Sequence, residues 1–142
     1  GGGPRMLKIA AQRADIVGIN ATLTSGSVDH STFDSMTAEA TDEKVEIVRR
    51  EAGDRIADIE MNIRAFLVSV TDDVDAALEG ISAFTGSPTS LISQSPFALV
   101  GPPSKLVEDL IARRERWGFS YVIVGTDEAE AFAPVVAELS GK

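Results

Sequence analysis

Apolar residues along the chain alternate between helical spacing and short continuous runs. Residues 4–14 begin with a proline, which suits the first helical position, and continue with the i, i+3, i+4, i+7 spacing of an amphipathic helix: Leu7, Ala10, Ala11 and Ala14. The next run, residues 15–19 (DIVGI), predicts a short buried strand, because a strand with one wet face would alternate. Residues 20–36 are polar and aperiodic, which predicts a long loop that is functional or mobile.

The middle of the chain repeats this order. Residues 37–52 predict a helix that ends at Gly53, and residues 59–70 (IEMNIRAFLVSV) predict one long strand that alternates and then becomes continuously apolar. Asp72 or Asp73 suits the cap of a third helix, whose predicted buried face is Val74, Ala77, Leu78 and Ile81. Residues 86–101 predict a loop-like region, rich in serine and proline.

The last third predicts a helix, a strand and a helix. The first helix opens at Pro102 and Pro103 and ends at Gly118, and residues 119–125 form a continuous apolar strand. The final helix has Pro134 in or near its first full turn. Helices that alternate with continuous apolar strands indicate an α/β fold with a parallel sheet covered by helices. Three strands make a poor complete domain, because both sheet edges would be open to unwanted pairing.

Composition narrows the function classes. The 142 residues carry a formal charge of −9, which disfavours nucleic acid and anionic membrane as partners. The absence of cysteine excludes disulfides, thiolate metal sites and cysteine nucleophiles, and no apolar stretch approaches the roughly 20 residues of a membrane-spanning helix. His30 has no nucleophile-elbow motif to serve and is expected in a solvated loop.

The strongest candidate chemistry lies at the start of the chain. Three glycines that lead into a helix at Pro4 can offer backbone N–H groups and the positive end of the helix dipole to an anion such as phosphate. The glycines taken alone also fit the remnant of a purification tag.

Other candidates have ordinary structural explanations. The run DDVD at residues 72–75 suits a helix cap better than a cation site, because it lacks the spacing of a calcium-binding loop. Glu60, Asn62 and Arg64 share one strand face, and Trp117 is expected to serve packing. No metal site is predicted.

Four segments, in this order, resemble the C-terminal half of the luciferase-like monooxygenases, especially their deazaflavin-dependent oxidoreductase branch: GGGPRMLKIAAQRADIVGI, EMNIRAFLVSVTDD, LIARRERWGFSYVIVG and EAFAPVVAEL. The resemblance spans nearly the whole chain. It implies that residues 1–142 are a partial (β/α)8 TIM-barrel domain, namely the last three strands with their helices. The glycines would then be native and would follow a fifth strand, with the N-terminal half absent.

The resemblance also implies a cytoplasmic oxidoreductase or monooxygenase that acts on a small-molecule substrate. The cofactor would be the deazaflavin coenzyme F-420, favoured over FMN, with its phosphate against Gly1, Gly2, Gly3 and Pro4. Asn20 falls where relatives place a polar contact to substrate or cofactor, although it equally suits a local turn. Catalytic residues are not assigned, and the chain alone is expected to be inactive.

The alternative is a non-enzymatic module that binds a phosphate-bearing ligand or a partner protein. In the barrel interpretation, isolated strands expose sheet edges and the apolar lumen side of FLVSV and YVIV. We therefore expect no stable isolated monomer, but a homo-oligomer or association with the missing half-barrel.

Overall fold

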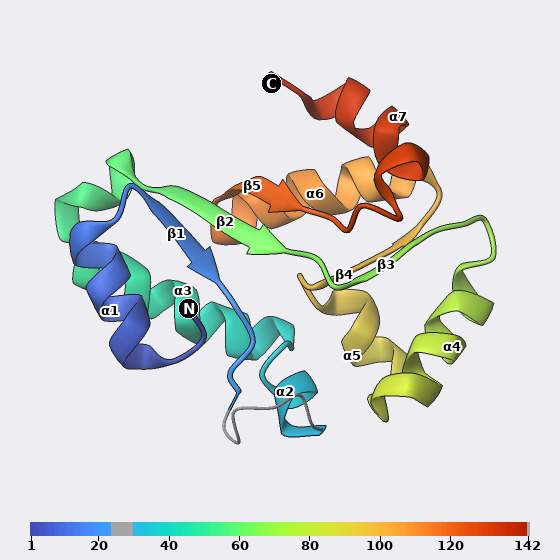
Figure 1. Cartoon of the computed structure of the whole chain (residues 1–142), viewed down its shortest axis with the longest axis horizontal. Helices are drawn as coiled ribbons and strands as arrows, with labels where there is room; N and C mark the ends of the chain where they lie inside the picture. Colours follow the sequence, from blue (N-terminus) through green and yellow to red (C-terminus); the bar gives the residue numbers. More distant parts are fainter. Residues whose placement is uncertain (24–29, 142) are drawn as a thin grey trace.

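The computed structural model describes residues 1–23 and 30–141, in which five short parallel strands form two small sheets. One sheet has the order β1 (Ile16–Ile19), β2 (Glu60–Arg64), β5 (Phe119–Ile123), and the other pairs β3 (Leu67–Val70) with β4 (Ala98–Gly101) (Figure 1). The helical elements are α1 (Pro4–Arg13), α2 (His30–Asp34), α3 (Ala38–Ala52), the 3-10 helix η1 (Gly53–Asp58), α4 (Val74–Thr85), α5 (Thr89–Gln94), α6 (Pro103–Trp117) and α7 (Ala129–Leu139). The α/β class with parallel strands is as predicted.

The predicted single strand over residues 59–70 is wrong, and so is the expected total of three strands. The Ala65 N–H still donates to Ile123 of β5 at 2.9 Å, but the next N–H, from Phe66, donates to Phe97 ahead of β4 at 2.9 Å. The chain therefore changes neighbours between residues 65 and 66, and β2 and β3 join different sheets. Apolar patterning cannot reveal this change, because both halves remain strand-like.

Two predicted loops contain regular structure. Residues 86–101 hold α5 and β4, and all four residues of β4 are buried. Residues 20–36 hold α2, which begins at His30, so His30 is not a loop residue. Residues 24–29 lie outside the described part of the chain. These elements are four to six residues long, too short for periodicity to distinguish them from their serine-rich and proline-rich surroundings.

Predicted helix ends are mostly confirmed. The side chain of Asp73 caps α4 by accepting from the Ala76 N–H, and Gly53 and Gly118 follow α3 and α6 with positive φ. Pro134 departs from the prediction because α7 already begins at Ala129, which places the proline inside the helix.

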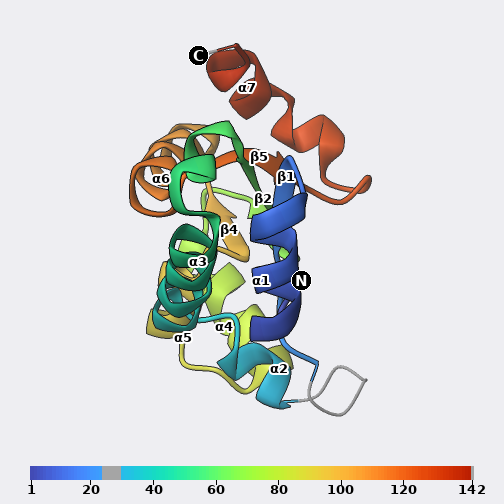
Figure 2. The ribbon, with the colours of Figure 1, turned by 90° about the vertical axis from the view of Figure 1, so that its left-hand side faces the viewer.

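The main core lies between the three-stranded sheet and helices α1 and α3. Its most buried members include Leu7, Val17, Val45, Val48 and Ile63. Figure 2 shows α3 and α6 on the same side of the strands.

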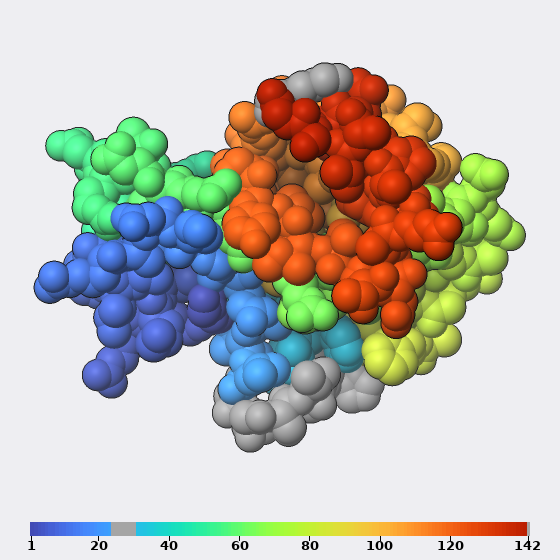
Figure 3. Space-filling model, turned by 45° about the horizontal axis from the view of Figure 1, so that its top comes forward, coloured from blue at the N-terminus to red at the C-terminus, as the bar shows by residue number. Residues whose placement is uncertain are grey.

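The helix α7 packs differently. It buries Phe132 and Val135 in a second cluster with Leu99 and Leu106, and so lies against α6. An open hollow of about 470 Å³ remains between β5, α6 and α7, where the surface dips in Figure 3.

Candidate functional site

The glycine turn (residues 1–3) lies beside the carboxyl end of β1. The Asn20 N–H donates to the Gly1 carbonyl at 3.1 Å, and the Thr22 hydroxyl donates to the Gly2 carbonyl at 3.0 Å. A Cβ on Gly2 would lie 2.1 Å from the carbonyl oxygen of Ala21, so glycine is required at this position. The turn predicted from the sequence and Asn20 therefore do meet at one edge of the sheet.

The first backbone N–H groups of α1 have no acceptor among the described residues. Gly3 is the N-cap residue and has no side chain to occupy the first turn, which also contains no acidic residue. Pro4 follows at the first helical position and has no N–H. Among the described residues no acceptor is seen for the N–H groups of Arg5 and Met6. A Cβ on Gly3 would contact nothing within 4 Å, so space is open beside these donors. Free N–H groups at a helix start favour phosphate or carboxylate.

The side chain of Asn20 forms a local turn, which is one of the two roles that the sequence suggested for this residue. Its side-chain oxygen accepts from the Ala21 N–H at 2.9 Å. The amide NH₂ of the same side chain has no hydrogen-bond acceptor in the described part of the chain.

Lys44 of α3 donates hydrogen bonds to this edge of the sheet from the protein interior. The sequence analysis did not identify it as a site residue. Its buried ammonium donates to the carbonyl oxygens of Asn20 at 2.9 Å and Ser35 at 2.7 Å. Desolvation by burial lowers its pKa from 10.5 to about 8, against a smaller raising effect of Glu43. A signal was present, because Thr41, Lys44, Val45 and Val48 share the buried stripe of the helix.

Two serine hydroxyls form hydrogen bonds with the backbone around the segment that enters α3. The Ser35 hydroxyl accepts from the Thr22 N–H at 2.8 Å and donates to the Thr32 carbonyl at 2.7 Å. The buried Ser95 hydroxyl donates to the Met36 carbonyl at 2.5 Å. The end of β1, the start of α3 and the segment before β4 are thus connected below the glycine turn.

The face of the three-stranded sheet opposite the main core carries several polar side chains. Strand register places Gly18, Asn62 and Tyr121 in one row, and the Asn62 side chain donates to the Tyr121 carbonyl at 2.9 Å. Gly18 leaves room for that side chain, because a Cβ there would lie 3.2 Å from the Asn62 oxygen. Glu60 and Arg64 lie on the same face as Asn62, as predicted.

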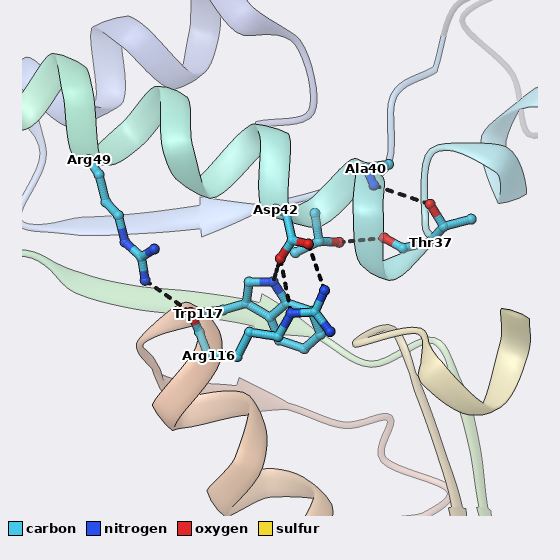
Figure 4. Close-up of polar contacts among 7 residues, drawn as sticks. Thr37, Ala40, Asp42, Arg49, Arg116 and Trp117 are labelled. Carbon is cyan, nitrogen blue, oxygen red and sulfur yellow. Dashed lines mark hydrogen bonds and ion pairs between the residues drawn. The ribbon is translucent and has the colours of Figure 1, made fainter.

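Trp117 packs as predicted, within a polar cluster that joins α3 to α6 (Figure 4). The Asp42 carboxylate accepts from the Trp117 indole at 2.7 Å and from two Arg116 nitrogens at 3.0 and 2.6 Å. The hydrogen bond from Arg116 is the main cause that lowers the pKa of Asp42. The Arg49 guanidinium adds a bond to the Arg116 carbonyl at 3.0 Å. This cluster serves helix packing.

Neither a metal-ligand cluster nor a membrane-spanning helix is found in residues 1–23 and 30–141. The run DDVD supplies the α4 cap, and residues 1–23 and 30–141 contain no group of three His, Asp or Glu side chains able to hold a metal ion. Among the helices described here, none has the length and apolar character needed to cross a membrane.

No protein-family model matches the sequence, and no curated protein does. Solved structures do match. The coenzyme F-420-dependent tetrahydromethanopterin reductase from Methanopyrus kandleri is similar with a TM-score of 0.61 and 20% identity, over 97% of this chain and 48% of that one. A long-chain alkane monooxygenase is similar with a TM-score of 0.56 and 14% identity, over 97% of this chain and 40% of that one.

Both neighbours are enzymes with the luciferase-like monooxygenase fold. This chain has the fold of the matched part of each neighbour. It does so over nearly its whole length, while it spans less than half the length of either neighbour. At these identities the likeness concerns the fold alone.

Proposed function

We propose that the chain is part of a luciferase-like oxidoreductase or monooxygenase that uses a flavin-type cofactor, with the cofactor phosphate at the amino end of α1. The observation that carries this proposal is the position of the glycine turn at the carboxyl edge of the sheet, beside the open N–H groups of α1. The fold shared with a coenzyme F-420-dependent reductase supports the deazaflavin as the preferred cofactor, with FMN as the second choice.

The residues present suit a phosphate group. The N–H groups of Arg5 and Met6 would donate to its oxygens, and Gly3 would allow it to approach the backbone closely. A bound flavin or deazaflavin supplies the hydride chemistry of such an enzyme. The free amide of Asn20 would contact the substrate or cofactor at the same edge, while Lys44 holds the Asn20 carbonyl in place.

The partners in this proposal are a small-molecule substrate and further polypeptide that completes the sheet, supplied either by another copy of the chain or by a complementary half-barrel. The outer edge of β5 has no strand partner among the described residues, which favours such association. The proposed location is the cytoplasm.

Amide chemical shifts of the ¹⁵N-labelled chain test the phosphate site directly. Addition of inorganic phosphate, and separately of FMN, should shift the Gly3, Arg5 and Met6 amides, whereas riboflavin, which lacks the phosphate, should shift them much less. Coenzyme F-420 is then compared with FMN by fluorescence titration. If neither phosphate nor FMN moves these amides, the proposed cofactor site is wrong.

A further inference from the structure

Lys44 brings a buried positive charge close to the glycine turn. The residue is 7% exposed, and its ammonium donates to the carbonyl oxygens of Asn20 and Ser35. The same nitrogen lies over the ring of Phe97, 5.9 Å from the ring centre. No carboxylate in residues 1–23 and 30–141 forms an ion pair with Lys44. Because a lysine is almost never buried without a charged partner, this ammonium lacks a counter-ion within the described chain.

Two hydrogen-bonded connections lead from Lys44 to the glycine turn. In the first, the carbonyl of Asn20 accepts from Lys44, while the N–H of Asn20 donates to the Gly1 carbonyl at 3.1 Å. In the second, Ser35 accepts from Lys44 through its carbonyl and from the Thr22 N–H through its hydroxyl. The Thr22 hydroxyl donates in turn to the carbonyl of the second glycine at 3.0 Å. The ammonium is therefore linked to both carbonyls that tie the turn to the end of β1.

The charge of Lys44 acts on the turn. Burial, and after it the charge of Lys44, lowers the pKa of the Gly1 amino group. A negative group at the amino end of α1 would be attracted by the same charge that disfavours a positive one. Among the described residues, Glu43 is the carboxylate that acts on the ammonium, and its effect is smaller than that of burial. The surroundings of Lys44 thus favour an anion at the turn.

We propose that Lys44 is a binding determinant of the cofactor site, with the phosphate at the amino end of α1 as the counter-ion of its buried ammonium. The inference rests on the proposed function, because it takes the position of the phosphate from there. The backbone N–H groups of α1 would contact the phosphate directly. Lys44 would act on it at longer range, through its charge and through the two carbonyls that it holds.

A counter-ion role makes phosphate binding depend on pH. Burial lowers the pKa of Lys44 to about 8, against a smaller raising effect of Glu43, so the ammonium loses most of its charge above that pH when no anion is bound. A bound phosphate would keep the proton on Lys44. Binding therefore takes up a proton in alkaline solution, and the affinity for the anion falls as the pH rises.

The titration of Lys44 itself tests the inference. Sulfate is the probe, because it resembles phosphate in shape and charge but does not titrate at neutral or alkaline pH. In the ¹³C-labelled full chain, the chemical shift of the Lys44 Cε reports its protonation with saturating sulfate and with sodium chloride at equal ionic strength. We expect sulfate to lower the acid dissociation constant of Lys44 about tenfold relative to sodium chloride.

Equilibrium dialysis with radiolabelled sulfate gives a second measurement. The affinity of the unaltered chain should fall about fivefold from pH 8 to 10, a range above the lowered pKa of the Gly1 amino group. Lys44→Met should bind about tenfold more weakly at pH 7 and show no such fall. Lys44→Gln, which keeps an N–H donor without the charge, should behave in the same way. Lys8→Met, which removes an exposed ammonium from α1, is the control and should keep the fall.

The outcomes separate this inference from the cofactor site on which it rests. If sulfate shifts the Gly3, Arg5 and Met6 amides at pH 7 but leaves the acid dissociation constant of Lys44 unchanged, the site stands and the counter-ion role is wrong. Full sulfate affinity in Lys44→Gln would assign Lys44 a hydrogen-bonding role in place of its charge. A complete lack of sulfate binding would overturn both the inference and the site.

Discussion

The ammonium nitrogen of Lys44 lies 2.9 Å from the carbonyl oxygen of Asn20, so helix α3 holds the end of β1 through a buried charge. No described carboxylate forms an ion pair with this lysine. Its positive charge is stabilised by backbone carbonyls and by the ring of Phe97, 5.9 Å away. A charge held in this way should make stability depend on pH.

Lys44→Met should remove a rise in stability above pH 8. Burial lowers the pKa of Lys44 from 10.5 to about 8, so the folded chain loses this proton first and unfolding takes up a proton between these values. The free energy of unfolding therefore increases with pH in this window. Relative to Lys44→Met, the unaltered chain should gain roughly 1–2 kcal/mol from pH 7.5 to 10, with partial screening by water included.

Urea unfolding at several pH values measures this difference. Lys8→Met, which removes a partly exposed ammonium on α1, is the matched control and should show no such rise. A difference between the unaltered chain and Lys44→Met that stays flat from pH 7.5 to 10 would contradict the assignment.

Substitutions at Gly3 should separate helix stability from phosphate binding. Gly3 has an extended backbone with φ −93° and space for a side chain, so Gly3→Asp and Gly3→Asn should each cap α1 and stabilise the fold by a few tenths of a kcal/mol. The carboxylate of Gly3→Asp would occupy the place proposed for the phosphate and repel it, which should lower phosphate affinity by at least about tenfold. Gly3→Asn caps the same N–H groups without charge, so the gap between the two variants measures repulsion alone. Equal phosphate affinity in both would refute the site.

Asp42→Asn should change the environment of the only tryptophan. The Asp42 carboxylate accepts from the Trp117 indole and from Arg116, and these bonds lie at a half-exposed surface. We expect a shift in Trp117 emission and a loss of less than about 1 kcal/mol of stability at neutral pH. The pKa of Asp42 is lowered in the fold, so the contribution is present above pH 3.8 and disappears as the pH falls through the lowered value. Glu46→Gln is the control, and an unchanged emission spectrum in Asp42→Asn would count against the contact.

The outer edge of β5 should drive association. Tyr121 is 43% exposed on this strand, and a lysine at an edge strand opposes pairing with another chain. We expect sedimentation in dilute solution to show a species larger than 15.0 kDa, formed by copies of the chain or by the chain with a complementary half-barrel. Tyr121→Lys should weaken that association. A cooperatively melting monomer of 15.0 kDa would disprove the half-barrel interpretation.

Features that depend on neighbouring residues could be predicted from the sequence. The caps at Asp73 and Gly118 follow from local hydrogen bonding and backbone freedom, and the strands ending at Ile19 and Ile123 follow from continuous apolar runs. The glycine turn and Asn20 were placed at one site only through the family resemblance, and the structure brings their backbones into contact.

Features that depend on distant residues could not be predicted. The strand β4 has only four residues, and the carbonyls at its start are held by the buried guanidinium of Arg113, which donates to Pro96 at 3.2 Å and to Ala98 at 2.5 Å. The exchange of strand neighbours at Ala65 likewise depends on Ile123 and Phe97, more than thirty residues away. Lys44 is an intermediate case. A lysine within an apolar stripe indicates that its ammonium has a buried partner, but the sequence does not show that the partner is the Asn20 carbonyl.

Gly2 imposes a sharp asymmetry on what the glycine turn can tolerate during evolution or engineering. Because any side chain at this position would run into the backbone of Ala21, a saturation library should retain glycine at position 2 in every folded member while position 3 accepts many residues. Within the glycine turn, ligand preference at the amino end of α1 can therefore be altered at position 3, whereas glycine at position 2 preserves the contact between the turn and the end of β1.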